Sequence, residues 1–234
     1  MLREQMLRML TQTPPDMRRH GLRGSLDIQE DDSEFVKRFK KLKADKWFCH
    51  SYIPIYEYLF HDLRYEPVDV LEIGVWRGDS LKVWEEYLPN ANVTGVDIDP
   101  NCAKIEFQRA VVDIHDQTDY EYFFEKYKRK MFDVVIEDGK HEYAANIMSA
   151  AIFHPMMKEN GIYIIEDIKG KLKHYSVLQG VEIDLQRFKK RRDDKLLLLP
   201  QGEYFQEKAE FVKDTVDSIT DEEIESYREQ YELV

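Results

Sequence analysis

The chain has 234 residues, of which 43% are hydrophobic and 12% aromatic, so it can bury a core and is not intrinsically disordered. Its net charge of −12 disfavours nucleic acid as a partner, because phosphate backbones are also negative. No apolar run reaches the roughly 20 residues of a membrane span, and charges interrupt the N-terminal segment where a signal peptide would be apolar. Two cysteines exclude a disulfide scaffold and a four-thiolate zinc site. We therefore expect a cytoplasmic protein without nucleic-acid or membrane partners.

The N-terminal residues 1–44 differ in character from the rest of the chain. They contain a Thr-Pro-Pro break at 13–15 and a mixed-charge segment at 33–43. This pattern predicts a helical extension or arm that packs on the rest of the chain or on a second copy, so we expect a homo-oligomer. Residues 45–234 are predicted to form one domain with an acidic C-terminal segment, since 201–234 carry eleven acids and three bases.

Apolar runs of strand length recur along residues 45–234. They lie at 68–73, 93–98, 110–114, 132–136 and 161–165, with a later candidate at 196–199. Continuous apolar runs of this kind suit strands that are buried on both faces of a parallel sheet. Helix-like segments at 80–87, 119–128 and 141–157 separate them. The alternation predicts an α/β fold with a doubly wound, mostly parallel, Rossmann-like sheet.

Ligands of such sheets bind outside the carboxyl ends of the strands, so the residues that follow each strand are candidates for the site. The first strand is followed by a turn that contains Gly74 and Gly78, which allow a tight turn and close approach of a ligand. Asp97 ends the second strand, 25 residues after Glu72, where an acid can accept hydrogen bonds from ribose hydroxyls. Together these residues predict an adenosine-containing ligand. The E-x-G-x-x-x-G form, with Glu72 leading, favours S-adenosylmethionine over NAD.

The segment after the third strand has two interpretations. Asp116 is placed to accept a hydrogen bond from the exocyclic amine of adenine. The alternative is a plain helix N-cap, a role for which Thr118 and Asp119 are equally suited. The residues alone leave both interpretations open.

Acids also follow the fourth and fifth strands, which should be neighbours in the sheet. They are Asp138, Glu166 and Asp167. Carboxylates crowded at one edge repel each other unless they are protonated or bind a metal, and Mg²⁺ prefers oxygen ligands. His141 lies three residues after Asp138 and can act as a base near neutral pH. The alternative is that Asp138 and Asp167 cap the helices that follow them, with His141 packed in the first turn.

Five segments in order along the chain resemble one family, the metal-dependent class I S-adenosylmethionine O-methyltransferases of the macrocin and mycinamicin type. They are Asp45–Lys46 with His50–Tyr52, Leu71–Gly74 with Gly78 and Ser80, Gly95–Pro100, Asp116–Asp119, and Asp138–His141 with Ile165–Ile168. The resemblance covers roughly residues 45–168. It implies a class I methyltransferase that moves a methyl group to a hydroxyl of a small molecule, as in the sugar of a glycosylated natural product or glycan.

The resemblance also implies S-adenosylmethionine and Mg²⁺ as cofactors and assigns residues to each. Asp97 would hold the ribose, Asp116 the adenine, and the loop from Glu72 to Gly78 the methionine part. The remaining cofactor residues, which lie in the matching segments, are Gly74, Ser80, Gln117 and Tyr52.

For the metal and the chemistry, the resemblance implies that Asp138, Glu166 and Asp167 ligate Mg²⁺ and that His141 is the general base. Lys140 departs from the family pattern, and a cation beside a metal site weakens metal binding unless it points to solvent.

Three alternatives share part of the pattern. A Mg²⁺-dependent catechol or phenol methyltransferase would use the same carboxylates but depend less on His141, because its acceptor is already acidic. A non-catalytic S-adenosylmethionine-binding module would have Lys140 in place of the metal. A nicotinamide-dependent oxidoreductase is disfavoured by the glycine spacing and by the lack of a Tyr-x-x-x-Lys pair near the fourth strand.

Overall fold

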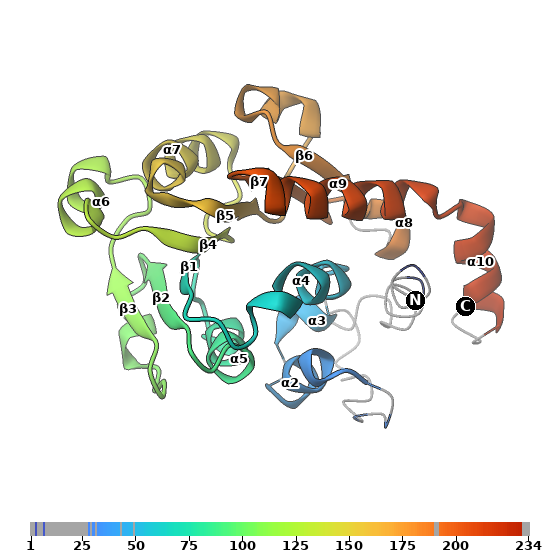
Figure 1. Ribbon diagram of the computed structural model, residues 1–234, viewed down its shortest axis with the longest axis horizontal. Coiled ribbons are helices and arrows are strands. Elements are labelled where there is room, and N and C mark those ends of the chain that lie inside the picture. Colours follow the sequence, from blue (N-terminus) through green and yellow to red (C-terminus); the bar gives the residue numbers. More distant parts are fainter. Residues whose placement is uncertain are drawn as a thin grey trace.

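The computed structural model describes residues 3, 7, 28, 30, 32–42, 44–48, 50–189 and 192–230 of the chain. Seven strands in these residues form one sheet in the order β3-β2-β1-β4-β5-β7-β6 (Figure 1). They are β1 (Asp69–Ile73), β2 (Asn92–Asp97), β3 (Val111–Ile114), β4 (Phe132–Glu137), β5 (Met157–Ile165), β6 (Val181–Asp184) and β7 (Lys195–Pro200). Strand β7 runs antiparallel to both of its neighbours, β5 and β6, and all other neighbouring pairs are parallel. The predicted α/β class with a mostly parallel, doubly wound sheet is confirmed.

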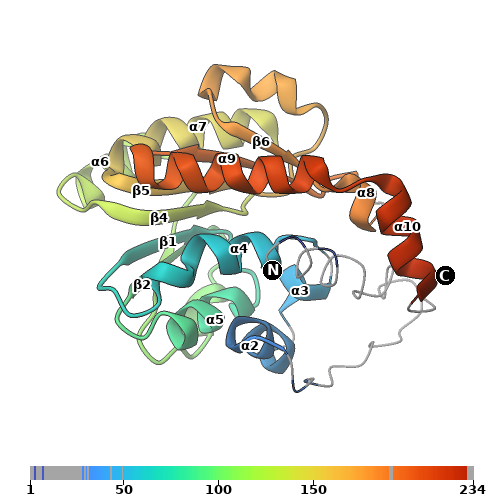
Figure 2. The ribbon, with the colours of Figure 1, turned by 45° about the vertical axis from the view of Figure 1, so that its right-hand side comes forward.

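Helices cover both faces of this sheet (Figure 2). The α-helices are α2 (Glu34–Leu42), α3 (Asp45–Phe48), α4 (Ile53–Phe60), α5 (Asp79–Tyr87), α6 (Tyr120–Tyr127), α7 (Tyr143–Phe153), α8 (Gln186–Lys189), α9 (Glu203–Ser218) and α10 (Asp221–Gln230). Side chains of α2, α4, α5 and α9 belong to one apolar cluster, and those of α6 and α7 belong to the other. None of the helices in the described part of the chain is long and apolar enough to span a membrane.

Four short 3₁₀ helices complete the described elements. They are η1 (His61–Leu63), η2 (Cys102–Lys104), η3 (His154–Met156) and η4 (Leu172–Leu178). The helix expected at 141–157 therefore ends earlier than predicted. Pro155 falls in η3, where its missing N–H cannot continue an α-helix, and Met157 already begins β5.

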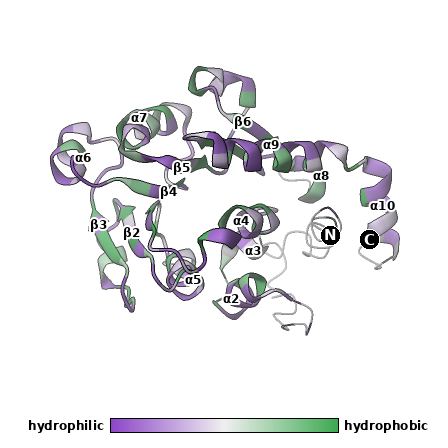
Figure 3. Cartoon of the chain, viewed as in Figure 1, coloured by the Kyte–Doolittle hydropathy of each residue, from purple (hydrophilic) through white to green (hydrophobic). Residues whose placement is uncertain are grey.

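The central strands alternate between the two clusters. Val70 of β1 and Val134 of β4 face the cluster on one side, and their neighbours Leu71 and Val135 face the other. Because both faces are covered, each central strand contains an apolar run, and green stretches mark apolar residues in Figure 3. Strand β6 is not among the predicted strands. It is a four-residue edge strand with two acids, so it lacks that apolar signature.

Helix α2 lies within the predicted arm of residues 1–44, yet it packs against α5. Phe35 and Phe39 are fully buried, and their rings lie 6.0 and 5.6 Å from the ring of Trp84. Phe35 also meets Tyr87 edge to face at 4.5 Å. These contacts join α2 to the apolar cluster beneath the site. The domain boundary at residue 44 stays a prediction, and most of the arm lies outside the described residues.

The contribution of α2 can be measured with Phe39→Ala. We expect it to lower the free energy of unfolding by about 3 to 4 kcal/mol, because it removes a buried ring from a well-packed site. Lys41→Ala is the matched control on the same helix, since its side chain is 63% exposed, and it should change stability by less than about 0.5 kcal/mol. Urea denaturation measures both. Equal stability of the two variants would show that α2 adds nothing to the fold.

Candidate functional site

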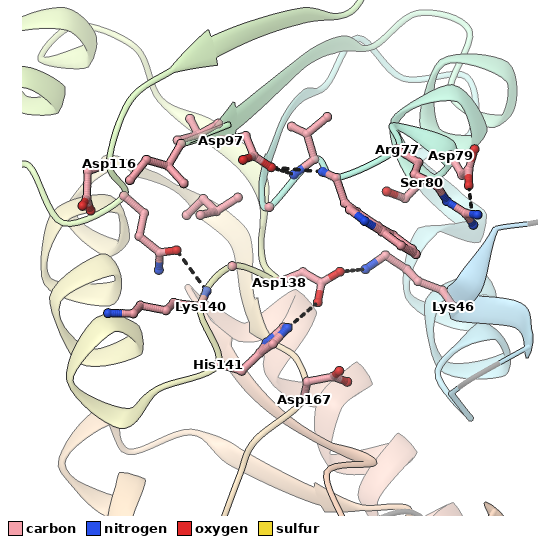
Figure 4. A pocket seen from close by; sticks show the side chains of 18 of the residues that line it. Lys46, Arg77, Asp79, Ser80, Asp97, Asp116, Asp138, Lys140, His141 and Asp167 are labelled. Carbon is pink, nitrogen blue, oxygen red and sulfur yellow. Dashed lines mark hydrogen bonds and ion pairs between the residues drawn. The ribbon is translucent and has the colours of Figure 1, made fainter. Parts of the chain in front are cut away.

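A cavity of about 660 Å³ opens at the carboxyl ends of the parallel strands. This volume is in the range of pockets that take a small organic ligand. Five of the predicted cofactor residues line it, namely Gly74, Ser80, Asp97, Asp116 and Gln117. The predicted metal and base residues Asp138, His141 and Asp167 line the same cavity (Figure 4). Residues from several strand ends therefore meet in one space, as the topology predicts.

The loop after β1 is held against the end of β4 by a close backbone contact. Gly74 has φ +92°, and a Cβ at this position would lie 2.2 Å from the carbonyl oxygen of Asp138. Only glycine fits both the conformation and the contact. The next two residues, Val75 and Trp76, donate their backbone N–H groups to Asp97 Oδ2 at 2.7 and 3.0 Å. The loop and the end of β2 are thus fixed to each other.

Asp97 is a preorganised acceptor at the cavity wall. Its second oxygen, Oδ1, accepts the backbone N–H of Asp99 at 2.8 Å. Burial raises the pKa of this carboxyl, but the N–H donors of Asp99, Trp76 and Val75 outweigh burial and hold its pKa below the usual value. The carboxylate is only half-buried and retains acceptor capacity, because its two oxygens offer about four lone-pair sites.

The structure confirms one of the two interpretations of the segment after β3, the helix N-cap. Asp119 is the N-cap of α6, since its side chain accepts the backbone N–H of Tyr122 at 3.0 Å. Asp116 is exposed at the cavity and accepts from Thr118 in a local turn, with N–H at 2.9 Å and hydroxyl at 2.8 Å. Capping by Asp119 leaves Asp116 available at the cavity wall.

The side chain of Gln117 hydrogen-bonds to the end of β4 and to the loop that follows it. Its Nε2 donates to Glu137 Oε1 at 2.7 Å, and its Oε1 accepts the backbone N–H of Lys140 at 3.2 Å. A Cβ at Gly139 would lie 2.0 Å from that same Oε1. Gln117 therefore lines the cavity and also sets the path of the chain between Asp138 and His141.

Three predicted cofactor residues do not line the cavity. Glu72 is fully buried and accepts hydrogen bonds from Ser80 Oγ and Trp84 Nε1, both at 2.7 Å. Gly78 adopts φ +70° and faces the side chain of Phe107. Tyr52 is fully buried and donates its hydroxyl to Asp167 Oδ1 at 2.6 Å. The structure gives these residues supporting positions behind the cavity wall.

Asp138, His141 and Asp167 form the candidate metal centre. Each offers one ligand atom, and these atoms lie within 4.8 Å of one another. His141 and Asp167 both have left-handed backbones, with φ of +54° and +50°, which is uncommon for residues other than glycine. The buried His141 Nδ1 has no hydrogen-bond partner among the described residues. An imidazole nitrogen beside two carboxylates is a donor set that a divalent cation can use.

Glu166, which we predicted as a third metal ligand, is not part of this group. Its carboxylate is buried and contacts Lys46 Nζ at 2.8 and 2.9 Å, and Tyr56 donates its hydroxyl to it. Lys46 Nζ also lies 2.6 Å from Asp138 Oδ2 and 3.4 Å from Glu72 Oε1. The ammonium therefore bridges the ends of β1, β4 and β5.

The electrostatics of Lys46 follow from these contacts. Burial lowers the pKa of a lysine, but the carboxylates of Asp138, Glu166 and Glu72 outweigh that cost and hold the pKa of Lys46 well above its usual value. The side chain is a permanent cation in the interior.

His50, which lies four residues after Lys46, contacts Asp167. His50 Nδ1 lies 2.9 Å from Asp167 Oδ1, and its ring stacks on Tyr52 with centroids 4.7 Å apart. Burial raises the pKa of Asp167, but the hydrogen bonds of His50 and Tyr52 outweigh it and hold this pKa well below its usual value. Asp167 is thus ionised and oriented.

Neither Lys46 nor His50 has a predicted role, although both lie within one segment that matches the family pattern. Charge was the feature of the sequence that could have pointed to Lys46. Four acids at neighbouring strand ends require a counter-charge, and Lys46 lies in the segment that precedes the first strand.

Lys140 does not occupy the candidate metal centre. Its side chain is exposed, and Nζ lies 3.2 Å from Glu142 Oε2. Figure 4 shows it directed away from Asp138, His141 and Asp167. The departure from the family pattern at this position therefore places a cation at the surface.

The close packing of Gly74 on Asp138 can be tested with Gly74→Ala. We expect a loss of about 2 kcal/mol or more of stability, from the clash and the strained φ together. Gly170→Ala is a matched control, because Gly170 has φ +91° and a Cβ added there would meet nothing within 4 Å, so it measures the strain alone. Thermal unfolding compares the two. If both variants lose the same stability, the contact between the loop and Asp138 does not contribute to the free energy of unfolding.

Comparison with known proteins shows what this chain is similar to. The family described as a methyltransferase domain matches residues 71–168. The mycinamicin VI 2''-O-methyltransferase of Micromonospora griseorubida is 35% identical over 156 residues, which are 63% of this chain and 38% of that protein. The demethylmacrocin O-methyltransferase of Streptomyces fradiae is 31% identical over 156 residues, again 63% of this chain and 38% of the relative.

A solved structure gives the same relationship. The MycE methyltransferase from the mycinamycin biosynthetic pathway, in complex with Mg and SAH, superposes with a TM-score of 0.54 at 32% identity, over 58% of this chain and 40% of that one. This chain spans about two fifths of the length of the curated relatives it matches. Residues 71–168 thus match a methyltransferase domain, and the resemblance to the sugar O-methyltransferases of the macrocin and mycinamicin type that we inferred from the sequence is confirmed.

Proposed function

We propose that this protein is an S-adenosylmethionine-dependent O-methyltransferase that acts on a sugar hydroxyl of a small glycosylated molecule, with Mg²⁺ as its metal. One observation carries the proposal. A single cavity joins the acceptor residues for an adenosine group, Asp97 and Asp116, to the cluster of Asp138, His141 and Asp167. The printed names of the relatives support the sugar, because the first relative is a 2''-O-methyltransferase of mycinamicin VI.

The residues present fit the adenosine cofactor. Asp97 is ionised, fixed by three backbone N–H groups and half-exposed to the cavity, so it can accept hydrogen bonds from a ribose. Asp116 lines the same wall beyond β3. The absent side chain at Gly74 leaves the backbone beside Asp138 open to close approach.

The residues also fit a hard divalent cation. Asp138 and Asp167 would hold it through carboxylate oxygens, and two protein carboxylates with water are a common ligand set for Mg²⁺. His141 is near enough to either bind the cation or serve the chemistry, and we assign it the base. Glu166 would join the ligands only by leaving Lys46.

In the proposed mechanism, the cofactors when bound supply an activated methyl group and acidify the acceptor hydroxyl. Asp138 and Asp167 would bind the cation and so position the acceptor hydroxyl. His141 accepts the hydroxyl proton at Nε2, the nitrogen that lies 3.8 Å from Asp138 Oδ1. The loop after β1, fixed by Asp97 and Gly74, would bind the methionine part of the cofactor and so orient its methyl group for transfer.

We further propose a cytoplasmic homo-oligomer whose residues 45–234 form the methyltransferase domain and whose residues 1–44 form the arm. The negative net charge agrees with an acceptor that is not a nucleic acid.

The cofactor assignment is tested by calorimetric titration with S-adenosylhomocysteine. Asp97→Ala should bind it at least about tenfold more weakly, because the ribose loses its acceptor and the β1 loop loses two hydrogen bonds. Asp99→Ala is the matched control, since its carboxylate contacts only Asn101 among the described residues, and it should bind as the parent does. Equal loss in both variants would contradict the role of Asp97.

The base assignment is tested by methyl transfer from labelled S-adenosylmethionine to mycinamicin VI, with a catechol as a second acceptor. His141→Ala should lower kcat by about 10² to 10⁴-fold, which is typical for the loss of a general base. Binding of S-adenosylhomocysteine and of Mg²⁺ should stay within about threefold of the parent. Loss of Mg²⁺ binding in His141→Ala would make His141 a ligand instead. Full turnover would exclude both roles.

A further inference from the structure

Lys46 extends from α3 to the carboxyl edge of the sheet. Its buried ammonium lies 2.6 Å from Asp138 Oδ2, 2.8 and 2.9 Å from the Glu166 oxygens, and 3.4 Å from Glu72 Oε1. Figure 4 shows Lys46 and His141 on opposite oxygens of Asp138. One carboxylate therefore serves both the internal cation and the candidate metal centre.

The charges at this edge of the sheet explain why the ammonium is there. Glu72 and Glu166 are fully buried, Asp167 is nearly so, and Asp138 is largely enclosed. Four crowded carboxylates repel each other strongly in a low-dielectric interior. Lys46 brings one positive charge to this edge and contacts three of the four groups. A divalent cation at Asp138 and Asp167 would bring two more, but it would sit within a few ångströms of the ammonium.

We propose that Lys46 is an internal counter-cation which holds Asp138 and Glu166 in the metal-free protein and which a divalent cation must displace from Asp138 in order to bind. This inference rests on the proposed function, because it takes Asp138 and Asp167 as metal ligands. It adds that the affinity for the metal is set by a lysine outside the ligand set, and that Glu166 becomes available to the metal only after the exchange.

The exchange needs no movement of the segment that carries Lys46. Lys46 belongs to the segment 44–52, whose other side chains hold Asp167 through His50 and Tyr52. Ser51 of the same segment donates its backbone N–H and its hydroxyl to the buried Asp194, at 3.1 and 2.7 Å. The anchors at Asp167 and Asp194 keep the segment in place when Lys46 moves, so only the lysine side chain needs to withdraw.

The proposal is tested by calorimetric titration of Mg²⁺ into Lys46→Met and Lys140→Met. Both variants lose one lysine charge near Asp138, but only Lys46 contacts it, since Lys140 is exposed and pairs with Glu142. Lys46→Met should bind Mg²⁺ about tenfold or more tightly than the parent, because a competing cation beside the ligands is gone. Lys140→Met should bind within about twofold of the parent, because solvent screens an exposed charge.

Unchanged or weaker Mg²⁺ binding by a folded Lys46→Met would overturn the proposal. If that variant does not fold, a crystal structure of the parent protein grown with Mg²⁺ decides. The proposal expects Lys46 Nζ to have left Asp138, and an intact contact beside a bound metal would refute it. Absence of any Mg²⁺ signal in the parent and in Lys46→Met would also refute it. S-adenosylhomocysteine titration of the same samples then shows separately whether the cofactor part of the proposed function stands.

Discussion

The crowding of carboxylates at the carboxyl edge of the sheet is the constraint on which the site depends. Parallel strands β1, β4 and β5 end side by side, and Glu72, Asp138 and Glu166 come with them. Burial of these charges is unfavourable unless cations and hydrogen-bond donors meet them. Lys46 and Tyr56, from helices that precede the sheet, contact Asp138 and Glu166. Ser80 and Trp84 of α5 donate to Glu72. The N-terminal helices are therefore part of the site's electrostatics as well as part of the core.

The same edge is divided into two functional halves by the rigid loop after β1. On one side, Asp97 accepts backbone N–H groups and lines the cavity. On the other side, Asp138 and Asp167 face each other across His141. Gly74 joins the halves, because its contact with the Asp138 backbone keeps them at a fixed separation. A methyl donor and its acceptor need such a fixed separation, since transfer requires three atoms in line.

Glu166 shows how a ligand set inferred from residue pattern can differ from the set that geometry makes available. The sequence pattern groups Glu166 with Asp138 and Asp167 as metal ligands. In the structure, however, its oxygens already accept hydrogen bonds from Lys46 and Tyr56. Occupation by an ammonium preserves the arrangement of the acids without a metal. In the exchange proposed above, Asp138 would serve Lys46 and a divalent cation in turn.

The sequence by itself determined the elements whose signal is local. Strands β1, β2, β4 and β5 are continuous apolar runs because helices cover both faces, and the residues that end them had to meet at one edge because the strands are parallel. All five segments of the resemblance contribute residues to the lining of one cavity.

Only the tertiary structure decided which way individual side chains point and which partners they have. Lys140 stands next to the acids in sequence yet turns to solvent, whereas Lys46 lies 92 residues before Asp138 and contacts it directly. Pairing of buried charges depends on distance in space, and chain separation carries no information about it. Likewise, Glu72 and Tyr52 lie behind the wall of the cavity and hydrogen-bond to residues that line it. The sequence did not show this, because burial and hydrogen-bond direction are properties of the folded chain.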